Sequence, residues 1–206
     1  MLKLIRVFLI ISLLVFTFSS CRRYRVEGTK MTSDKVSYAV PYFNTSQKEY
    51  LYSADINVFK NALSGILVVK KLENGSKRLA LLSEFGNTLL DFEFIKDEVN
   101  VIYIMEDLNK RIIVKKLKKY FQLLVQSEYE IRKTYEAEGR KTYISKLQGK
   151  RIFLNLNTTE QLSHLKQASI FKNKVGIHFY GDKEYADSIL FESFELPITI
   201  DLRKRN

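Results

Sequence analysis

Residues 65–82, GILVVKKLENGSKRLALL, carry the clearest structural signal in the chain. Two apolar runs, residues 65–70 and 77–82, stand on either side of Glu73-Asn74-Gly75-Ser76. An Asn-Gly pair between apolar runs is the strongest short-range sign of a β-hairpin, because both residues tolerate the positive φ that the turn requires. The sequence therefore predicts two antiparallel strands joined by a tight turn.

The same kind of pattern continues on both sides of this hairpin. Upstream, Tyr52, Ala54, Ile56 and Val58 alternate with polar residues, and Phe59 is the apolar residue that breaks the alternation. Residues 159–168 fit either a short helix or a strand. Further strands are predicted around residues 90–95, 99–104, 141–146, 151–154, 169–171, 175–179, 188–191 and 196–202.

Between residues 106 and 124 the apolar period becomes helical. The apolar residues recur at intervals of four or five positions: Leu108, Ile112, Leu117, Phe121 and Leu124. This spacing is typical of one face of an amphipathic helix. Glu106 and Asp107 stand at its start and lysines toward its end, which suits the helix dipole.

These elements predict a mainly β (α+β) fold. Short connections imply antiparallel neighbours, so we expect one curved antiparallel sheet of about 9–11 strands. A single helix cannot cover both faces of such a sheet, so residues 106–124 are expected to cross its concave face. The expected architecture is an incomplete, half-open β-barrel with space for an apolar pocket between helix and sheet.

The N-terminus has the layout of a secretory signal. Lys3 and Arg6 precede an apolar run, residues 7–18, that is shorter than the roughly 20 residues of a membrane-spanning helix. Phe18-Ser19-Ser20-Cys21 resembles the lipobox of bacterial lipoproteins, although that family prefers an aliphatic residue where Phe18 stands. In that family the signal is cut before the cysteine, which receives lipid. The alternatives are an ordinary signal peptide with an incidental cysteine and an uncleaved signal anchor.

We therefore predict a signal peptide at residues 1–20, a lipidated tether at residues 21–46 and a single β domain at residues 47–206. Cleavage removes Lys3 and Arg6 and lowers the formal net charge from +11 to +9. So basic a chain suits anionic membranes or acidic ligands, and export disfavours nucleic acid as a partner. We expect a monomer that contacts membrane lipid through an acylated (palmitate-type) Cys21.

Three segments resemble the LolA/LolB superfamily of lipoprotein carriers and receptors, over about residues 48–204. They are Leu63–Lys70, Glu84–Phe94, and Ala186–Ile189 followed by Leu196–Leu202. The resemblance implies an unclosed antiparallel barrel whose helices form a lid over a hydrophobic cavity for acyl chains, and the anchored branch is LolB-like. This chain departs from the family in having one predicted helix, and Leu72 is the candidate for the family's exposed loop leucine.

The resemblance also implies a location and a function. In the family's sorting rule an Asp after the cysteine retains the protein at the inner membrane, and Arg22 follows Cys21 here. The implied location is the outer membrane, facing the periplasm. The implied function is binding of acyl chains or other lipoproteins in a hydrophobic cavity, in support of lipoprotein localisation. The alternative is a non-catalytic structural or interaction lipoprotein with a packed core.

Two groups of residues are candidates for lipid contact. The pocket candidates are apolar side chains of predicted strands: Ile66, Val68, Leu81, Phe85, Leu90, Phe92 and Phe94. An acyl pocket and an ordinary core use the same side chains, so both interpretations stay open. The headgroup candidates are basic residues of the predicted helix: Lys110, Arg111, Lys115, Lys116, Lys118 and Lys119. A solvated outer helix face is the other interpretation of this second group.

No catalytic, metal or cofactor site is predicted. His164 and His178 are 14 residues apart with no cysteine beside them, which disfavours zinc, and His178 is expected to point outward from its strand. Asp91 and Glu93 share one strand face, which we assign to solvent. The chain has no Gly-x-Ser-x-Gly motif and no glycine-rich phosphate loop. We therefore expect that the protein is not an enzyme.

Overall fold

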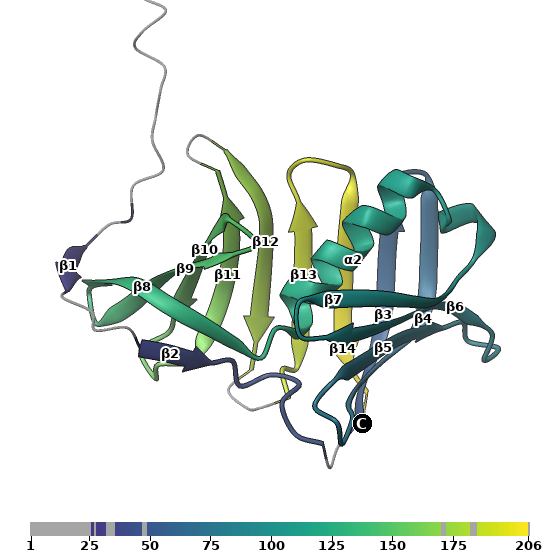
Figure 1. The fold of residues 1–206 in the computed structure, drawn as a ribbon, viewed down its shortest axis with the longest axis horizontal. Helices are drawn as coiled ribbons and strands as arrows, with labels where there is room; N and C mark the ends of the chain where they lie inside the picture. The colour runs from purple at the N-terminus through teal and green to yellow at the C-terminus, as the bar shows by residue number, and fades with distance from the viewer. Residues whose placement is uncertain are drawn as a thin grey trace, which may run out of the picture.

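The structure is a computed structural model that describes residues 26, 28–31, 36–46, 49–169, 172–181 and 185–205. The predicted signal peptide (residues 1–20) and Cys21 lie outside these residues. In the described part of the chain, a 14-stranded antiparallel sheet curves without closing, and a single α-helix lies against it (Figure 1). The predicted fold class, an incomplete barrel with one helix, is confirmed.

The strands account for most of the described residues. They are β1 (Thr29–Met31), β2 (Val36–Ala39), β3 (Glu49–Val58), β4 (Asn61–Lys71), β5 (Lys77–Leu82), β6 (Thr88–Ile95), β7 (Glu98–Ile104), β8 (Glu128–Ala137), β9 (Arg140–Leu147), β10 (Lys150–Leu156), β11 (Leu162–Ala168), β12 (Asn173–Tyr180), β13 (Ser188–Ser193) and β14 (Ile198–Lys204). A short 3-10 helix, η2 (Glu106–Leu108), precedes the α-helix, α2 (Arg111–Val125).

Most strands pair with their neighbours in sequence, as short connections require. The order across the sheet is β1-β8-β9-β10-β11-β12-β13-β14-β3-β4-β5-β6-β7, and β2 also pairs with β8. Besides the pairing of β1 and β2 with β8, β14 pairs with β3, which sets Ile200 opposite Ile56 and brings the C-terminal strand to the middle of the sheet. The Asn74-Gly75 hairpin is present as predicted, with Gly75 at φ 82° and the Asn74 side chain accepting from Ser76 N at 2.9 Å.

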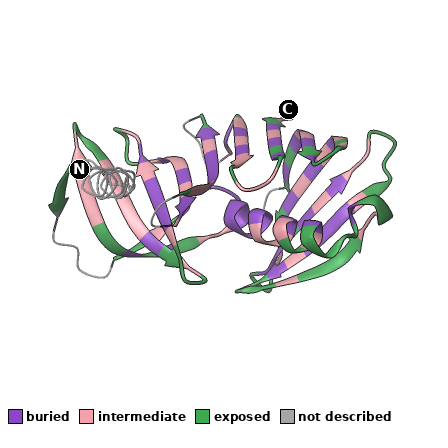
Figure 2. Cartoon of the chain, turned by 90° about the horizontal axis from the view of Figure 1, so that it is seen from above, coloured by how far each residue is buried: buried purple, intermediate pink, exposed green. Residues whose placement is uncertain are grey.

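The inner face of the sheet and the apolar face of α2 form one core. In β3, the predicted alternation holds, with Tyr52, Ala54, Ile56 and Val58 all buried. The helix places Leu117, Phe121 and Leu124 into this core, and Figure 2 shows it lying within the curve of the sheet. The helix thus covers one part of the concave face, as expected for a single helix.

The ends of α2 differ from the expected dipole arrangement. Glu106 and Asp107 lie in η2, and α2 itself has no acidic residue in its first turn and no basic residue in its last. The cation at its C-terminal end comes instead from β5, where Lys77 Nζ donates to the carbonyl oxygen of Val125 at 2.7 Å. Lys77 of β5 therefore supplies the hydrogen-bond donor at the C-terminal end of α2 that the helix's own residues do not provide.

The sheet begins earlier than the predicted boundary at residue 47. Strands β1 and β2, inside the segment assigned to the tether, pair with β8. Val40, Tyr42 and Phe43 belong to the core, and the Tyr42 ring stacks on Phe179 with centroids 4.4 Å apart. Burial of three large apolar side chains holds this segment against the sheet, so part of the assigned tether belongs to the folded unit.

Two other segments raise the strand count above the expected 9–11. Residues 128–137, for which no element was predicted, form β8, and the ambiguous residues 159–168 contain β11. A register shift between Ile131 and Lys133 interrupts the alternation in β8. A β-bulge of this kind moves later side chains to the other face, so the period-two signal is lost over the full segment.

Candidate functional site

The space under α2 is filled by side chains. Three predicted pocket residues, Leu81, Leu90 and Phe92, have 0% exposure, and Phe94 has 5%. The Phe92 ring lies 5.9 Å from that of Phe121 on the helix. Since no water-sized sphere touches a side chain of zero exposure, Leu81, Leu90 and Phe92 line no solvent-sized void. These residues are packed as core in the structure.

The remaining predicted pocket residues lie elsewhere. Ile66 and Val68 alternate with the buried Leu67 and Val69 of β4, so they lie on the other face of the sheet. Phe85 is in the β5–β6 turn and is 93% exposed. The structure therefore does not bring the seven predicted residues together around one cavity.

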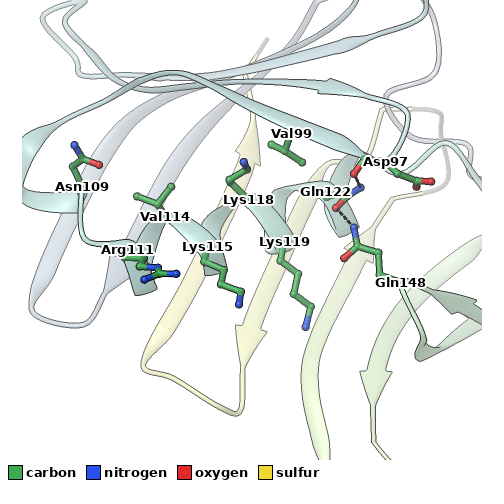
Figure 3. A pocket seen from close by; sticks show the side chains of 10 residues that line it. All are labelled: Asp97, Val99, Asn109, Arg111, Val114, Lys115, Lys118, Lys119, Gln122 and Gln148. Atoms are coloured by element: carbon green, nitrogen blue, oxygen red, sulfur yellow. Dashed lines mark hydrogen bonds between the residues drawn. The ribbon is translucent and has the colours of Figure 1, made fainter.

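A groove of about 560 Å³ lies on the outer side of α2. The lining residues come from the helix, the β6–β7 turn and the β9–β10 turn: Asp97, Val99, Asn109, Arg111, Val114, Lys115, Lys118, Lys119, Gln122 and Gln148 (Figure 3). Four of these side chains are cationic and one is anionic. We call this region the cationic groove.

The wall of the cationic groove is held by amide side chains. Gln122, which is buried, donates to the carbonyl oxygen of Asp97 at 3.3 Å and accepts from Gln148 Nε2 at 2.9 Å (Figure 3). Gln148 has φ 48°, in the left-handed region that suits a turn residue before Gly149. These bonds fix both turns relative to the helix, so the groove is built from three separate parts of the chain.

Four of the six predicted headgroup residues line this groove: Arg111, Lys115, Lys118 and Lys119. Burial, and then the charges of Lys116 and other nearby lysines, lower the pKa of Lys119. Like charges in one groove repel one another, and an anion bound there would relieve that repulsion. The electrostatics of the groove thus favour an anionic ligand.

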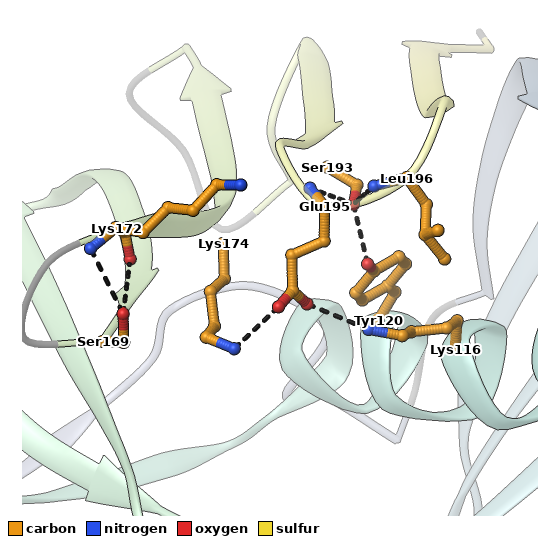
Figure 4. A network of polar contacts seen from close by, with 8 residues as sticks. All are labelled: Lys116, Tyr120, Ser169, Lys172, Lys174, Ser193, Glu195 and Leu196. Atoms are coloured by element: carbon orange, nitrogen blue, oxygen red, sulfur yellow. Dashed lines mark hydrogen bonds and ion pairs between the residues drawn. The ribbon is translucent and has the colours of Figure 1, made fainter.

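Lys116 has a different role from the one predicted. Its Nζ bonds to Glu195 at 2.9 Å, and Lys174 Nζ bonds to the other oxygen of Glu195 at 2.6 Å (Figure 4). Burial alone would raise the pKa of Glu195, but the bonds from Lys174 and Lys116 outweigh it and lower the pKa to about 2. Beside this bridge, Tyr120 and Ser193 share a hydrogen bond of 2.7 Å. Lys116 therefore holds α2 to the β13–β14 loop.

A second pocket, of about 650 Å³, lies at the N-terminal end of α2. It is lined by the β3–β4 turn and the start of the helix: Phe59, Lys60, Asn61, Lys110, Arg111, Ile112 and Ile113. Phe59 and Ile112 are large apolar side chains that are 43% and 65% exposed. We call this region the apolar pocket, and Arg111 lines both it and the cationic groove.

Phe59 was not among the predicted site residues. The signal that could have found it is its position, because it is apolar on the polar side of an alternating strand pattern. In the structure it has φ 58°, a left-handed conformation that is unusual for a bulky residue. An exposed aromatic ring held in a strained turn is the kind of outlier that accompanies functional sites.

Other residues considered from the sequence have structural partners. Asp91 accepts three hydrogen bonds from Arg78, at 2.9, 3.2 and 2.6 Å, so it is not a free carboxylate beside Glu93. His164 and His178 stack on neighbouring strands with centroids 3.9 Å apart. Burial, then the charges of His178 and Lys166, lower the pKa of His164 to about 4. Within the described ranges, no three His, Cys, Asp or Glu side chains are grouped as metal ligands.

The comparisons with known proteins concern overall fold. No protein-family model and no curated protein matches the chain. A DUF1329 family protein from Desulfovibrio piger is 11% identical, with a TM-score of 0.41 over 80% of this chain and 86% of that one. A domain described as an outer membrane lipoprotein-sorting protein, from Vibrio parahaemolyticus, is 9% identical, with a TM-score of 0.40 over 77% and 83% of the two chains. Similarity at this level identifies no site residue.

A search of the described residues for a membrane-crossing helix found none of sufficient length and apolar character.

Proposed function

We propose that this chain is a lipid-anchored envelope protein that binds an anionic acyl lipid along the outer side of α2. The observation that carries the proposal is that Arg111 lines both the cationic groove and the apolar pocket. A ligand with a charged head and an apolar chain is the class of molecule that fits two such adjoining surfaces. This moves the expected acyl site from beneath the helix to its exposed side.

Each part of such a ligand has a source of binding free energy. Lysines near an anionic lipid surface contribute about 1 kcal/mol each, and Lys115 and Lys118 are free to act in this way at the groove. Burial of an acyl chain contributes about 0.8 kcal/mol per methylene. Phe59 and Ile112 offer exposed apolar area for that burial. Anchoring through Cys21 would keep the site near its ligand. The residue after Cys21 is Arg22 and not Asp, so the sorting rule of the resembled family points to the outer membrane.

The packed interior supports a second candidate, an interaction lipoprotein that holds no lipid. Leu81, Leu90 and Phe92 have no exposed area, so an acyl chain could enter beneath α2 only after the helix moved. This candidate predicts that the outer surface of α2 binds a protein partner instead. The two candidates differ in one measurable property, which is saturable lipid binding by the purified chain.

The test is a titration with two lysolipids of the same chain length, lysophosphatidylglycerol (anionic) and lysophosphatidylcholine (zwitterionic), below their micelle concentrations. We expect tighter binding of the anionic lipid. A Lys115→Gln/Lys118→Gln variant should lose about 30-fold in affinity for it, from about 1 kcal/mol per cation. The matched control is Arg132→Gln/Lys133→Gln, an equal charge change on exposed positions of β8, which should bind normally.

The apolar half of the proposal is tested separately with Phe59→Gly. Gly is favoured at the left-handed φ of this turn, so the variant removes the ring without adding backbone strain. We expect weaker binding of both lysolipids in a normally folded protein. No saturable binding of either lipid by the wild-type chain would leave the interaction lipoprotein as the better account.

A further inference from the structure

The two histidines of this chain lie side by side in the sheet, although they are distant in sequence. They are 14 residues apart, yet antiparallel pairing of β11 with β12 sets His164 directly opposite His178. Their rings are 3.9 Å apart between centroids and inclined by 14°. Figure 1 shows these two strands side by side. Neither histidine lines either of the two pockets described above.

The pair lies on the outer face of the sheet. Leu165 follows His164, Ile177 precedes His178, and both belong to the core. Successive side chains of a strand point to opposite faces of the sheet, so the two histidines point away from the core. Both histidines are half-buried. Solvent and solutes can reach such rings, whereas the β-sheet backbone holds their positions.

Gly176 and the Phe194 ring lie beside one ring nitrogen of the pair. Gly176 stands two residues before His178 on the same face, and a Cβ there would lie 3.5 Å from His164 Nε2 and from the Phe194 ring. Glycine therefore keeps a side chain out of the region that this nitrogen faces. On the neighbouring strand β10, Asn155 pairs in register with His164, and its Oδ1 accepts a hydrogen bond from Thr142 Oγ1 at 3.0 Å.

We propose that His164 and His178 together bind a divalent late transition-metal ion, with Cu²⁺ the tightest of the series. Imidazole nitrogen is a preferred ligand of Cu²⁺, Ni²⁺ and Zn²⁺, and the Irving–Williams order places Cu²⁺ first. The two imidazoles supply two ligands, and water or a solution ligand completes the coordination sphere. The 14-residue separation of the two histidines disfavoured a metal site in the sequence analysis. The register of β11 and β12 sets them directly opposite each other.

The spacing of the rings fits a shared ion after a limited movement. Metal–nitrogen bonds of about 2.0–2.1 Å in the tetragonal geometry of Cu²⁺ hold two neighbouring ligand nitrogens about 2.9 Å apart. The ring centroids are already 3.9 Å apart. Each ring must tilt about its side-chain bonds so that the lone pairs converge on the ion. A Cβ at Gly176 would already be in contact with His164 Nε2 and the Phe194 ring, so glycine at this position avoids further crowding of that tilt.

The experiment is a titration of the full chain in detergent with Cu²⁺ alone, followed by electron paramagnetic resonance and thermal unfolding. We expect one saturable site with hyperfine splitting from two imidazole nitrogens and a concentration-dependent rise in Tm. His164→Gln and His178→Gln should each weaken binding by about tenfold or more, since even loss of an outer-shell partner costs a site 10–100-fold.

The matched control is Lys166→Gln, a substitution to the same residue on the same strand face. Removing this neighbouring cation should leave Cu²⁺ binding intact or tighten it, because its charge opposes that of the metal. Two results would overturn the proposal: an absence of saturable binding, or binding that persists with both histidines replaced. The histidine variants should bind lysolipid normally, so a failed metal test would leave the proposed lipid function untouched.

Discussion

Phe59 combines a strained backbone with an exposed ring. Its φ of 58° lies in the left-handed region, which costs a residue with a Cβ roughly 1–2 kcal/mol relative to the right-handed one. The ring is 43% exposed, so burial of the side chain offsets this cost only in part. The positive φ belongs to the tight β3–β4 turn, and the lipid proposal uses only the exposed ring that this turn carries.

The strain can be measured by comparing Phe59→Gly with Phe59→Ala. Both substitutions remove the ring, and only alanine keeps the Cβ that is unfavourable at positive φ. We expect the glycine variant to be more stable than the alanine variant by about 1 kcal/mol in urea unfolding. Equal stabilities, or a more stable alanine variant, would show that the turn is not strained.

Lys77 is a buried cation whose charge depends on its surroundings. It is 4% exposed on β5, and its Nζ donates to the last turn of α2. Burial, and then the charge of Lys71, lower the pKa of Lys77 to about 7 from an unfolded value of 10.5. Between these two pH values the unfolded chain holds a proton that the folded chain has released.

The stability of the protein should therefore rise with pH through this window. The linkage slope is at most about 1.4 kcal/mol per pH unit for one proton, and it should appear between about pH 7 and 10. Lys77→Met lacks this group, so the difference in unfolding free energy between wild type and variant should change with pH. Denaturant unfolding at pH 7, 8 and 9 tests this, and parallel profiles would contradict it.

At the scale of elements, α2 is attached to the sheet by its apolar face and by one charged bridge. Glu195, in the β13–β14 loop, accepts from Lys116 of the helix and from Lys174 of β12 (Figure 4). All three side chains are about one quarter exposed, so solvent screens the bridge only in part. The helix can therefore present its other cations to solvent while remaining fixed.

Removing the carboxylate should destabilise the protein in a pH-dependent way. The folded pKa of Glu195 is lowered to about 2, so its contribution is present above pH 4.5 and is lost as the pH falls toward 2. Glu195→Gln should cost about 2 kcal/mol at pH 7 and far less near pH 2. Thermal unfolding of both proteins across this range is the measurement, and a constant difference would argue against the bridge.

In the whole molecule, one pocket lies along α2 and the other at its N-terminal end, while the histidine pair lies on β11 and β12. The cationic groove and the apolar pocket adjoin at Arg111, which lines both. A membrane anchor at the N-terminus would leave this surface free to meet lipid. The anchor is thus a separate and testable part of the proposal.

Cys21→Ser should remove the lipid attachment of the protein. Lipid chains contribute about 0.8 kcal/mol per buried methylene, and stable attachment depends on more than one chain. We expect the wild-type chain in the membrane fraction and the variant in the soluble periplasmic fraction or held as uncleaved precursor. Ser20→Ala, which keeps a small residue before the cysteine, is the control, and a processed variant that stays on the membrane would oppose lipidation.

The local elements could be predicted from the sequence, because hydrophobic period and turn chemistry are properties of neighbouring residues. The Asn74-Gly75 hairpin, the β3 alternation and the amphipathic helix follow from spacing alone. The sequence patterns missed β8, where a bulge after Ile131 breaks the period, and the pairing of β1 and β2, which depends on a strand about 100 residues away.

The contacts between side chains of distant segments could be learned only from the folded chain. The sequence could not separate a pocket from a core, and in the structure Phe92 packs against Phe121 with no exposed area. It could not pair His164 with His178, align Gln148 with Gln122, or place Lys77 at the end of α2. Each of these contacts depends on strand register and chain path, which are set by the summed burial of the whole sheet and not by any local pattern.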